Sequence, residues 1–218
     1  YNDQIGQTEC TKKCPAGRFY SDATRKANTA LWGQAECTNC AVGEYQNEEG
    51  KNTCKTCSAG QYQDTTGNSG CKNCPAGKAT DLVLNEGNTD RTECQSCGVG
   101  YYSGYSGNTY CQPCSAMYWM TPQFWGAGKY QNEEGKTSCK TCGLTETTYS
   151  NAASACVSCP TGTRASSNYI GTCGHCWYGE YQDQLGQTTC KTCAAGQYSS
   201  QTGRSSCSSC DTGRYSGG

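Results

Sequence analysis

The segment CSAGQYQDTTGNSGCKNC, residues 57–74, contains the repeating unit of this chain. It reads C-x-x-G-x-Y-x4-G-x3-C-x-x-C, and residues 40–57 and 176–193 follow the same pattern. The 22 cysteines form eleven close pairs, and seven of the ten steps between successive pairs are 17 residues long. Such a fixed period indicates a tandem array of one small module.

The composition explains why cysteine is so frequent. Leu, Ile, Val and Phe together account for only 13 of 218 residues, too few for a conventional hydrophobic core, whereas Cys accounts for 22. In a secreted chain this balance is typical of a disulfide scaffold. A closed loop of about 15 residues contributes roughly 3 kcal/mol in the chain-entropy model. We therefore expect a small disulfide-rich fold, mostly β or irregular, built as an elongated rod of short two-stranded modules.

The period predicts one continuous array over residues 1–218, with partial repeats at 1–13 and 211–218. The complete repeats are expected at 14–40, 40–57, 57–74, 74–97, 97–114, 114–142, 142–159, 159–176, 176–193 and 193–210. Three insertions lengthen the array, near 20–32, 80–87 and 117–127. Each repeat is expected to contact mainly its neighbours, as repeat proteins do.

Two glycine positions and one tyrosine position recur within the module. The first glycine follows the second cysteine of a pair by three residues, and the second glycine lies seven residues further on, where a turn is expected to need positive φ. In residues 142–156 these positions hold Thr145 and Ala152. Tyrosine has a large apolar face and one polar end. We expect the recurring tyrosine to cover a neighbouring disulfide while its hydroxyl stays in water.

Spacing alone does not fix the disulfide pairing. The preferred pairing joins the second cysteine of each pair to the first cysteine of the next pair: Cys14–Cys37, Cys40–Cys54, Cys57–Cys71, Cys74–Cys94, Cys97–Cys111, Cys114–Cys139, Cys142–Cys156, Cys159–Cys173, Cys176–Cys190 and Cys193–Cys207. Cys10 and Cys210 then have no partner within the chain. Either they pair between subunits, head to tail, or they pair with cysteines of flanking repeats.

With C-P-x-G openings at Cys14, Cys74 and Cys159, the pattern resembles the ephrin-receptor-like cysteine-rich repeat. It is more distantly similar to tumour necrosis factor receptor modules with a single bridge. The resemblance implies an extracellular, elongated, disulfide-bonded rod, and the repeat is used in receptors, adhesins and structural appendages. Long arrays of this kind are similar to those of mastigoneme shaft proteins, which form the hairs of algal and protist flagella.

The three insertions contain most of the large apolar residues. Exposed apolar patches often mark contact sites, and Trp and Tyr are frequent at binding hot spots. We therefore favour subunit or partner interfaces over the alternative, in which each insertion folds back on its own module. The expected interface residues are Leu31, Trp32, Leu82, Leu84, Tyr118, Trp119, Phe124 and Trp125.

Several other chemistries are disfavoured, and we expect no catalytic residues, no metal ligands and no cofactor. Repeated C-x-x-C pairs are also compatible with zinc, but this chain has a single histidine and evenly spread basic residues. The tetrad at 173–176 matches a disulfide-isomerase motif without its helix, and the acidic turns 46–51 and 131–136 are typical of solvated loops rather than calcium sites. No basic stripe predicts nucleic-acid binding, and no apolar run is long enough to span a membrane.

The sequence therefore predicts a secreted, non-enzymatic structural protein located outside the cell or at its surface. We expect it to assemble with itself into a filament or surface appendage, with other extracellular proteins or glycans as further partners. Two alternatives remain open. One is a receptor or adhesin ectodomain that binds its ligand through the Trp-rich insertion, and the other is a zinc-binding C-x-x-C array.

Overall fold

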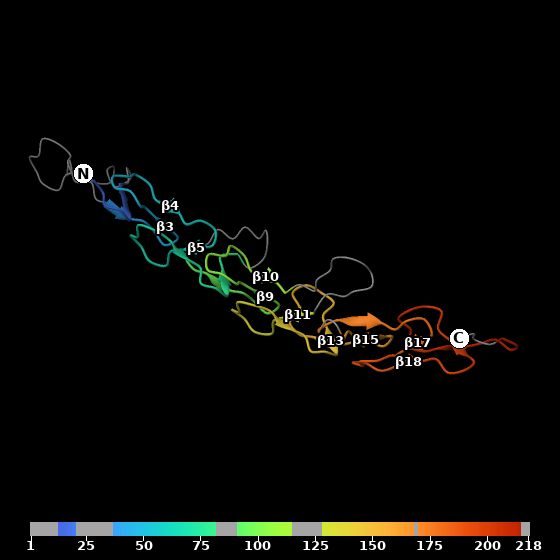
Figure 1. Cartoon of the computed structure of the whole chain (residues 1–218). Helices are drawn as coiled ribbons and strands as arrows, with labels where there is room; N and C mark the ends of the chain where they lie inside the picture. Colours follow the sequence, from blue (N-terminus) through green and yellow to red (C-terminus); the bar gives the residue numbers. More distant parts are fainter. Residues whose placement is uncertain (1–12, 21–36, 82–90, 115–127, 168–169, 215–218) are drawn as a thin grey trace, which may run out of the picture. The chain divides into compact units, whose positions relative to one another are not determined.

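A computed structural model describes residues 13–20, 37–81, 91–114, 128–167 and 170–214 (Figure 1). Within these residues the chain forms short strands and no helix, so no described helix could cross a membrane. The chain divides into two compact units, one made of Tyr1–Cys97 with Ser103–Cys111 and the other of Gly98–Tyr102 with Gln112–Gly218. One continuous array over the whole chain stays a prediction.

Every described strand belongs to an antiparallel two-stranded hairpin. Four hairpins lie in the first unit: β1 (Arg18–Tyr20) with β2 (Cys37–Asn39), β3 (Glu44–Tyr45) with β4 (Lys55–Thr56), β5 (Gln61–Tyr62) with β6 (Lys72–Asn73), and β7 (Lys78–Ala79) with β8 (Gln95–Ser96). Six lie in the second unit: β9 (Tyr101–Tyr102) with β10 (Gln112–Pro113), β11 (Lys129–Tyr130) with β12 (Lys140–Thr141), β13 (Glu146–Thr147) with β14 (Val157–Ser158), β15 (Thr163–Ala165) with β16 (Cys173–His175), β17 (Glu180–Tyr181) with β18 (Lys191–Thr192), and β19 (Gln197–Tyr198) with β20 (Ser208–Ser209).

The two strands of a hairpin come from fixed places in the repeat. The first strand usually ends at the recurring tyrosine, and the second consists mainly of the two residues between the cysteines of a pair. In the hairpin of β5 and β6, for example, Tyr62 lies opposite Lys72. The predicted fold class, small and disulfide-rich with short two-stranded modules, is confirmed.

Ten disulfides connect the described hairpins, and they are the ten pairs of the preferred ladder. Their Cα–Cα distances lie between 5.5 and 5.8 Å. Seven of the disulfides join cysteines 14 residues apart, and the other three have separations of 23, 20 and 25 residues. Cys210 is a free thiol of intermediate exposure, and Cys10 lies outside the described residues.

The buried interior consists largely of these disulfides. Among the described residues, the buried apolar side chains are cysteines and two alanines, Ala79 and Ala165. Polar side chains are buried beside them, and glutamines are the largest of those. Covalent bonds and polar side chains therefore occupy the space that Leu, Ile, Val and Phe fill in an ordinary domain.

Successive modules are joined by backbone hydrogen bonds as well as by the chain. The Gly43 amide donates to the carbonyl oxygen of Gln63 at 2.7 Å, and the Gly67 amide donates to that of Cys40 at 2.9 Å. The same two bonds recur further along the chain, for example from Gly162 to Gln182 and from Gly186 to Cys159. Each module therefore satisfies backbone groups of the next.

Contacts also extend to the next module but one, which the sequence did not lead us to expect. A Cβ atom at Gly60 would overlap the carbonyl oxygen of Gly107, two modules later. Gly162 approaches Gly203 in the same way. The first glycine is therefore needed for its positive φ and also because another backbone passes directly over it.

Ala152 takes the place of the second glycine in its module and is the one non-glycine residue with positive φ, at 60°, in the described part of the chain. Its amide donates to the carbonyl oxygen of Cys114, as the glycine does in other modules. The hydrogen bond thus holds an alanine in the left-handed region, which is unfavourable for residues with a Cβ atom.

We expect Ala152→Gly to raise the free energy of unfolding by about 1 kcal/mol, because relief of the left-handed strain exceeds the entropy that glycine adds to the unfolded chain. Urea denaturation with the disulfides intact measures the change. Ala195→Gly is the matched control, since Ala195 is exposed and its φ is not positive. It should lower the stability slightly, and an equal effect in both variants would contradict the explanation.

Candidate functional site

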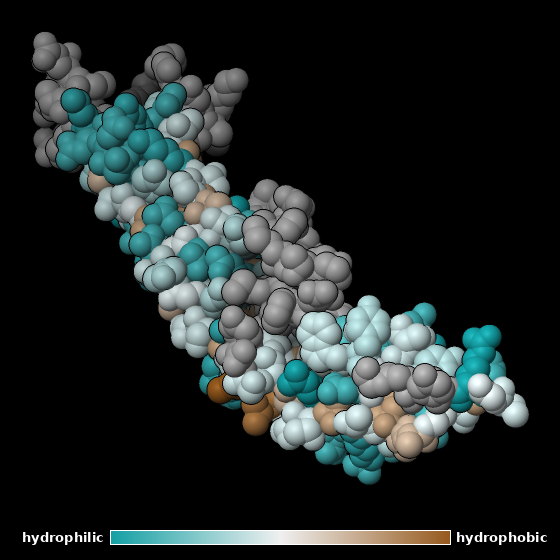
Figure 2. Space-filling model, turned by 45° about the vertical axis from the view of Figure 1, so that its right-hand side comes forward, coloured by the Kyte–Doolittle hydropathy of each residue, from teal (hydrophilic) through white to brown (hydrophobic). Residues whose placement is uncertain are grey.

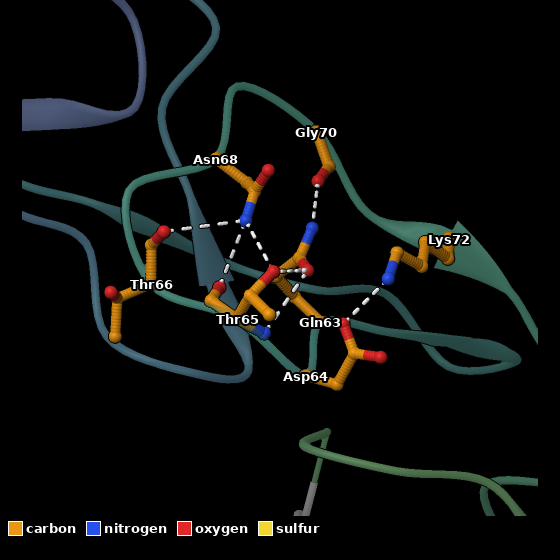
Figure 3. Close-up of polar contacts among 7 residues, drawn as sticks. All are labelled: Gln63, Asp64, Thr65, Thr66, Asn68, Gly70 and Lys72. Carbon is orange, nitrogen blue, oxygen red and sulfur yellow. Dashed lines mark hydrogen bonds and ion pairs between the residues drawn. The ribbon is translucent and has the colours of Figure 1, made fainter.

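In four of the described modules, a buried glutamine follows the recurring tyrosine and forms hydrogen bonds to the backbone of the turn. The side chain of Gln63 is 2% exposed, and its Nε2 atom donates to the carbonyl oxygen of Gly70 at 2.6 Å. Its Oε1 atom accepts from the backbone amide and the hydroxyl of Thr65, at 3.3 and 3.1 Å (Figure 3). Buried amides of this kind stabilise a fold only when both ends are hydrogen-bonded, as they are here.

The same arrangement recurs in three other modules, at Gln46, Gln131 and Gln182. In each, Nε2 donates to the carbonyl seven residues on, and Oε1 accepts from the amide two residues on. Sequence reasoning missed this position. The available signal was the dipeptide Tyr-Gln, which occurs in the same place in all four modules.

Lysines on the second strand pair with acidic side chains of the turn. The Nζ atom of Lys72 lies 2.6 Å from Oδ1 of Asp64, as Figure 3 shows, and Lys191 lies at the same distance from Asp183. The two lysines also lie over tyrosine rings of the first strand, 5.8 Å from the ring centre of Tyr62 in one hairpin and 5.9 Å in the other. These two tyrosine rings are thus in contact with a lysine of the opposite strand. That the recurring tyrosine covers a disulfide stays a prediction.

Each acidic turn considered for calcium holds one of its two glutamates in ion pairs with lysines. Glu133 lies 2.8 Å from the Nζ atom of Lys136 and 2.6 Å from that of Lys140. These hydrogen bonds lower the pKa of Glu133 from 4.5 to about 2. Glu48 is bound in the same way, which also lowers its pKa. Lysine Nζ atoms therefore already neutralise one carboxylate in each of these turns.

The Glu133 pairs should be visible in a carbon-detected NMR titration. A lowered pKa means that the pairs stabilise the fold above the ordinary value of 4.5 and that this contribution disappears as the pH falls towards about 2. The effect on the free energy of unfolding should be small, because the carboxylate is solvent-exposed and screened. We expect Lys140→Gln to raise the pKa of Glu133. The same change at Lys129, which lies opposite Thr141, should leave it unchanged.

On the face shown in Figure 2, most described residues are hydrophilic or of intermediate hydropathy, and only a few are apolar. Leu144, Val157 and Leu185 are all exposed. Each is next in sequence to a residue of one local cluster, because a Cβ atom at Gly186 would lie 3.7 Å from Ser158 and 3.9 Å from Thr145. Trp177 and Tyr178 precede the first glycine of their module and are 56% and 67% exposed.

The sequence predicted a set of interface residues in the three insertions. They lie outside the described residues: Leu31, Trp32, Leu82, Leu84, Tyr118, Trp119, Phe124 and Trp125. Their role stays a prediction.

Of the cysteines in the described part of the chain, all but Cys210 are bonded in disulfides. The two sulfurs of the Cys173–Cys176 tetrad belong to different disulfides, with Cys159 and Cys190. No group of His, Cys, Asp and Glu in the described ranges could hold a metal ion. The C-x-x-C pairs thus act as junctions between consecutive disulfides, which explains the spacing without a metal.

This geometry accords with the comparison with known families. A family model described as tyrosine-protein kinase ephrin type A/B receptor-like matches residues 29–61 and 49–83. Residues 29–83 are similar to the ephrin-receptor-like repeat. A search of curated proteins found no match. The ephrin-receptor-like stretch includes the hairpins of β3 with β4 and of β5 with β6, and the same hairpin recurs as far as β20.

Proposed function

We propose that this chain is an extracellular structural protein, a segment or subunit of a filament or surface appendage comparable to the mastigoneme shaft. The observation that carries the proposal is the regular disulfide ladder, in which each module is also hydrogen-bonded to the next. Disulfides on this scale form in the secretory pathway and persist outside the cell. The similarity to ephrin-receptor-like repeats supports the same location. The proposed role is mechanical and spatial rather than catalytic, and it needs no cofactor.

Immunogold electron microscopy of unpermeabilised cells that make the protein tests this role. Antibodies against residues 37–81 should label fibres or surface appendages at regular intervals. The same antibodies should label nothing on cells that lack the gene. Labelling confined to the cytosol of sectioned cells would contradict the proposal.

Self-assembly is the partner relation that we propose for such a fibre, with other extracellular proteins or glycans as further partners. We expect Trp119→Ser combined with Trp125→Ser to abolish assembly in sedimentation experiments, because these residues lie in the most aromatic insertion. Trp177→Ser removes an exposed tryptophan from a regular module and is the matched control. Normal assembly of the double variant would eliminate the insertion as the interface.

A receptor or adhesin ectodomain is the second candidate. The exposed pair Trp177 and Tyr178 favours it, because the other described modules carry smaller side chains at these two positions. Aromatic side chains of this kind anchor protein ligands. Binding of a soluble ligand that Trp177→Ala with Tyr178→Ala abolishes would favour this candidate over a purely structural role.

A further inference from the structure

We propose that the disulfide ladder makes the chain an inextensible tether, in which tension bypasses the loops of the modules. The inference depends on the structural role proposed above for its biological use. The path that the tension takes depends only on the order of the disulfides along the chain. It concerns covalent connectivity alone, so it applies whatever the arrangement of the two units.

The path of tension follows from the pairing. Force that enters at Cys57 crosses the disulfide to Cys71, since this route is far shorter than the loop of 14 residues between them. It then runs through Lys72 and Asn73 to Cys74, which begins the next disulfide. The same step repeats at every junction, because each described C-x-x-C pair from 37–40 to 190–193 belongs to two consecutive disulfides.

The bypassed parts are those that hold the recurring tyrosine, the buried glutamine and both glycines. The strands that bear the load are the second strands of the hairpins, such as β4 and β6. All three insertions lie in bypassed loops, between Cys14 and Cys37, Cys74 and Cys94, and Cys114 and Cys139. Tension therefore does not pass through the segments that we expect to contact partners.

The geometry fixes the length of the tether. With Cα–Cα distances of 5.5–5.8 Å across the disulfides and three residues in each link, the path from Cys14 to Cys207 extends to about 150 Å. The same chain without disulfides would extend to about 670 Å. Oxidation thus reduces the maximal extension more than fourfold.

Each disulfide stores a defined length. Its reduction should release about 43 Å for each of the seven disulfides with a separation of 14 residues. The separations of 20, 23 and 25 residues should release about 64, 75 and 82 Å. A different pairing of the same cysteines would give a different set of lengths.

Single-molecule force spectroscopy on the whole chain tests the proposal, with a handle at each end and free thiols alkylated beforehand. Without reductant, the fitted contour length between Cys14 and Cys207 should not exceed about 150 Å. A small dithiol is then added at constant force. Each dithiol attacks one sulfur, forms a mixed disulfide and closes on itself, which transfers two electrons and leaves two cysteine thiols. We expect ten steps with the four lengths given above.

A variant with Cys57→Ser and Cys71→Ser provides the control. Its contour length without reductant should rise by about 43 Å, and one of the seven short steps should disappear. A contour length of several hundred ångströms in the oxidised wild-type chain, or ten equal short steps from pairs closed within each C-x-x-C, would overturn the proposal. Cytosolic labelling in the microscopy experiment would overturn the structural role and leave the measured tether intact.

Discussion

Full reduction of the disulfides is expected to abolish the folded structure at room temperature. The described interior holds cysteines and two alanines as its buried apolar side chains, so that little hydrophobic burial remains once the covalent bonds are gone. Each loop closed by a separation of 14 residues contributes about 3 kcal/mol in the chain-entropy model, although the contributions of ten disulfides need not add. Circular dichroism and limited proteolysis, before and after reduction and alkylation, measure the loss.

One disulfide removed at a time gives a graded version of the same result. Cys57→Ser with Cys71→Ser should lower the free energy of unfolding by about 3 kcal/mol, and the loss should concentrate in the neighbouring modules, since repeat stability is local. Cys210→Ser is the control, because Cys210 takes part in none of the ten disulfides described within the chain. For the fully reduced protein, protease resistance and an unchanged circular dichroism spectrum would contradict the first prediction, because the polar contacts alone would then maintain the fold.

The second large effect is expected at the glycines over which another backbone passes. Gly162→Ala should destabilise the protein far more than Gly196→Ala. Both residues have a φ of +77°, so the cost of placing alanine in the left-handed region, about 1–2 kcal/mol, is shared. Only at Gly162 would the new Cβ atom overlap the carbonyl oxygen of Gly203. Overpacking of this kind adds about 1–3 kcal/mol.

Hydrogen exchange measures both where in the chain the destabilisation occurs and how large it is. In Gly162→Ala, the amide of Gly203, which donates to the carbonyl oxygen of Cys176, should lose most of its protection. In Gly196→Ala this amide should stay protected, because no described heavy atom lies within 4 Å of the new Cβ atom. Equal losses in the two variants would mean that positive φ alone explains the glycine and that the close approach is unimportant.

Much of the fold could be predicted from the sequence, because disulfide bonds require cysteine and left-handed backbone favours glycine, so both appear directly in the residue pattern. Cysteines at a fixed spacing led to the ladder that includes Cys57–Cys71, and the second glycine of the module marked positive φ at positions such as Gly67. The positive φ of the first glycine, as at Gly60, was not predicted. Even the exception was informative, since Ala152 adopts the conformation of the glycine that it replaces.

The packing could not be predicted in the same way. We singled out the recurring tyrosine for its apolar face and did not identify the next residue, which is buried, as at Gln63. A glutamine is buried only where local carbonyl and amide groups satisfy both ends of its side chain, and that depends on the folded path of the turn. The contact between Gly60 and Gly107 is equally invisible in the sequence, because it joins modules that are not adjacent.

An interaction site was predicted only as a hypothesis about the insertions, and it stays a prediction. Trp119 and Trp125 were singled out by their apolar character in a chain that has almost none, and no described contact involves them. The exposed positions that the structure does describe, Leu144 and Leu185 among them, were not selected. They come from modules two apart along the chain, and only the fold brings the adjacent residues Thr145 and Gly186 close to each other.

The buried glutamines also determine how the protein should respond to temperature. Unfolding exposes amide groups and sulfur rather than aliphatic side chains, and polar exposure offsets the rise in heat capacity that apolar exposure causes. The heat-capacity change per residue should therefore be smaller than in an ordinary domain. A small change flattens the stability curve, so that both chilling and moderate heating alter the free energy of unfolding only slowly. An extracellular fibre built from such modules would keep nearly the same stability through the daily and seasonal temperatures of its surroundings.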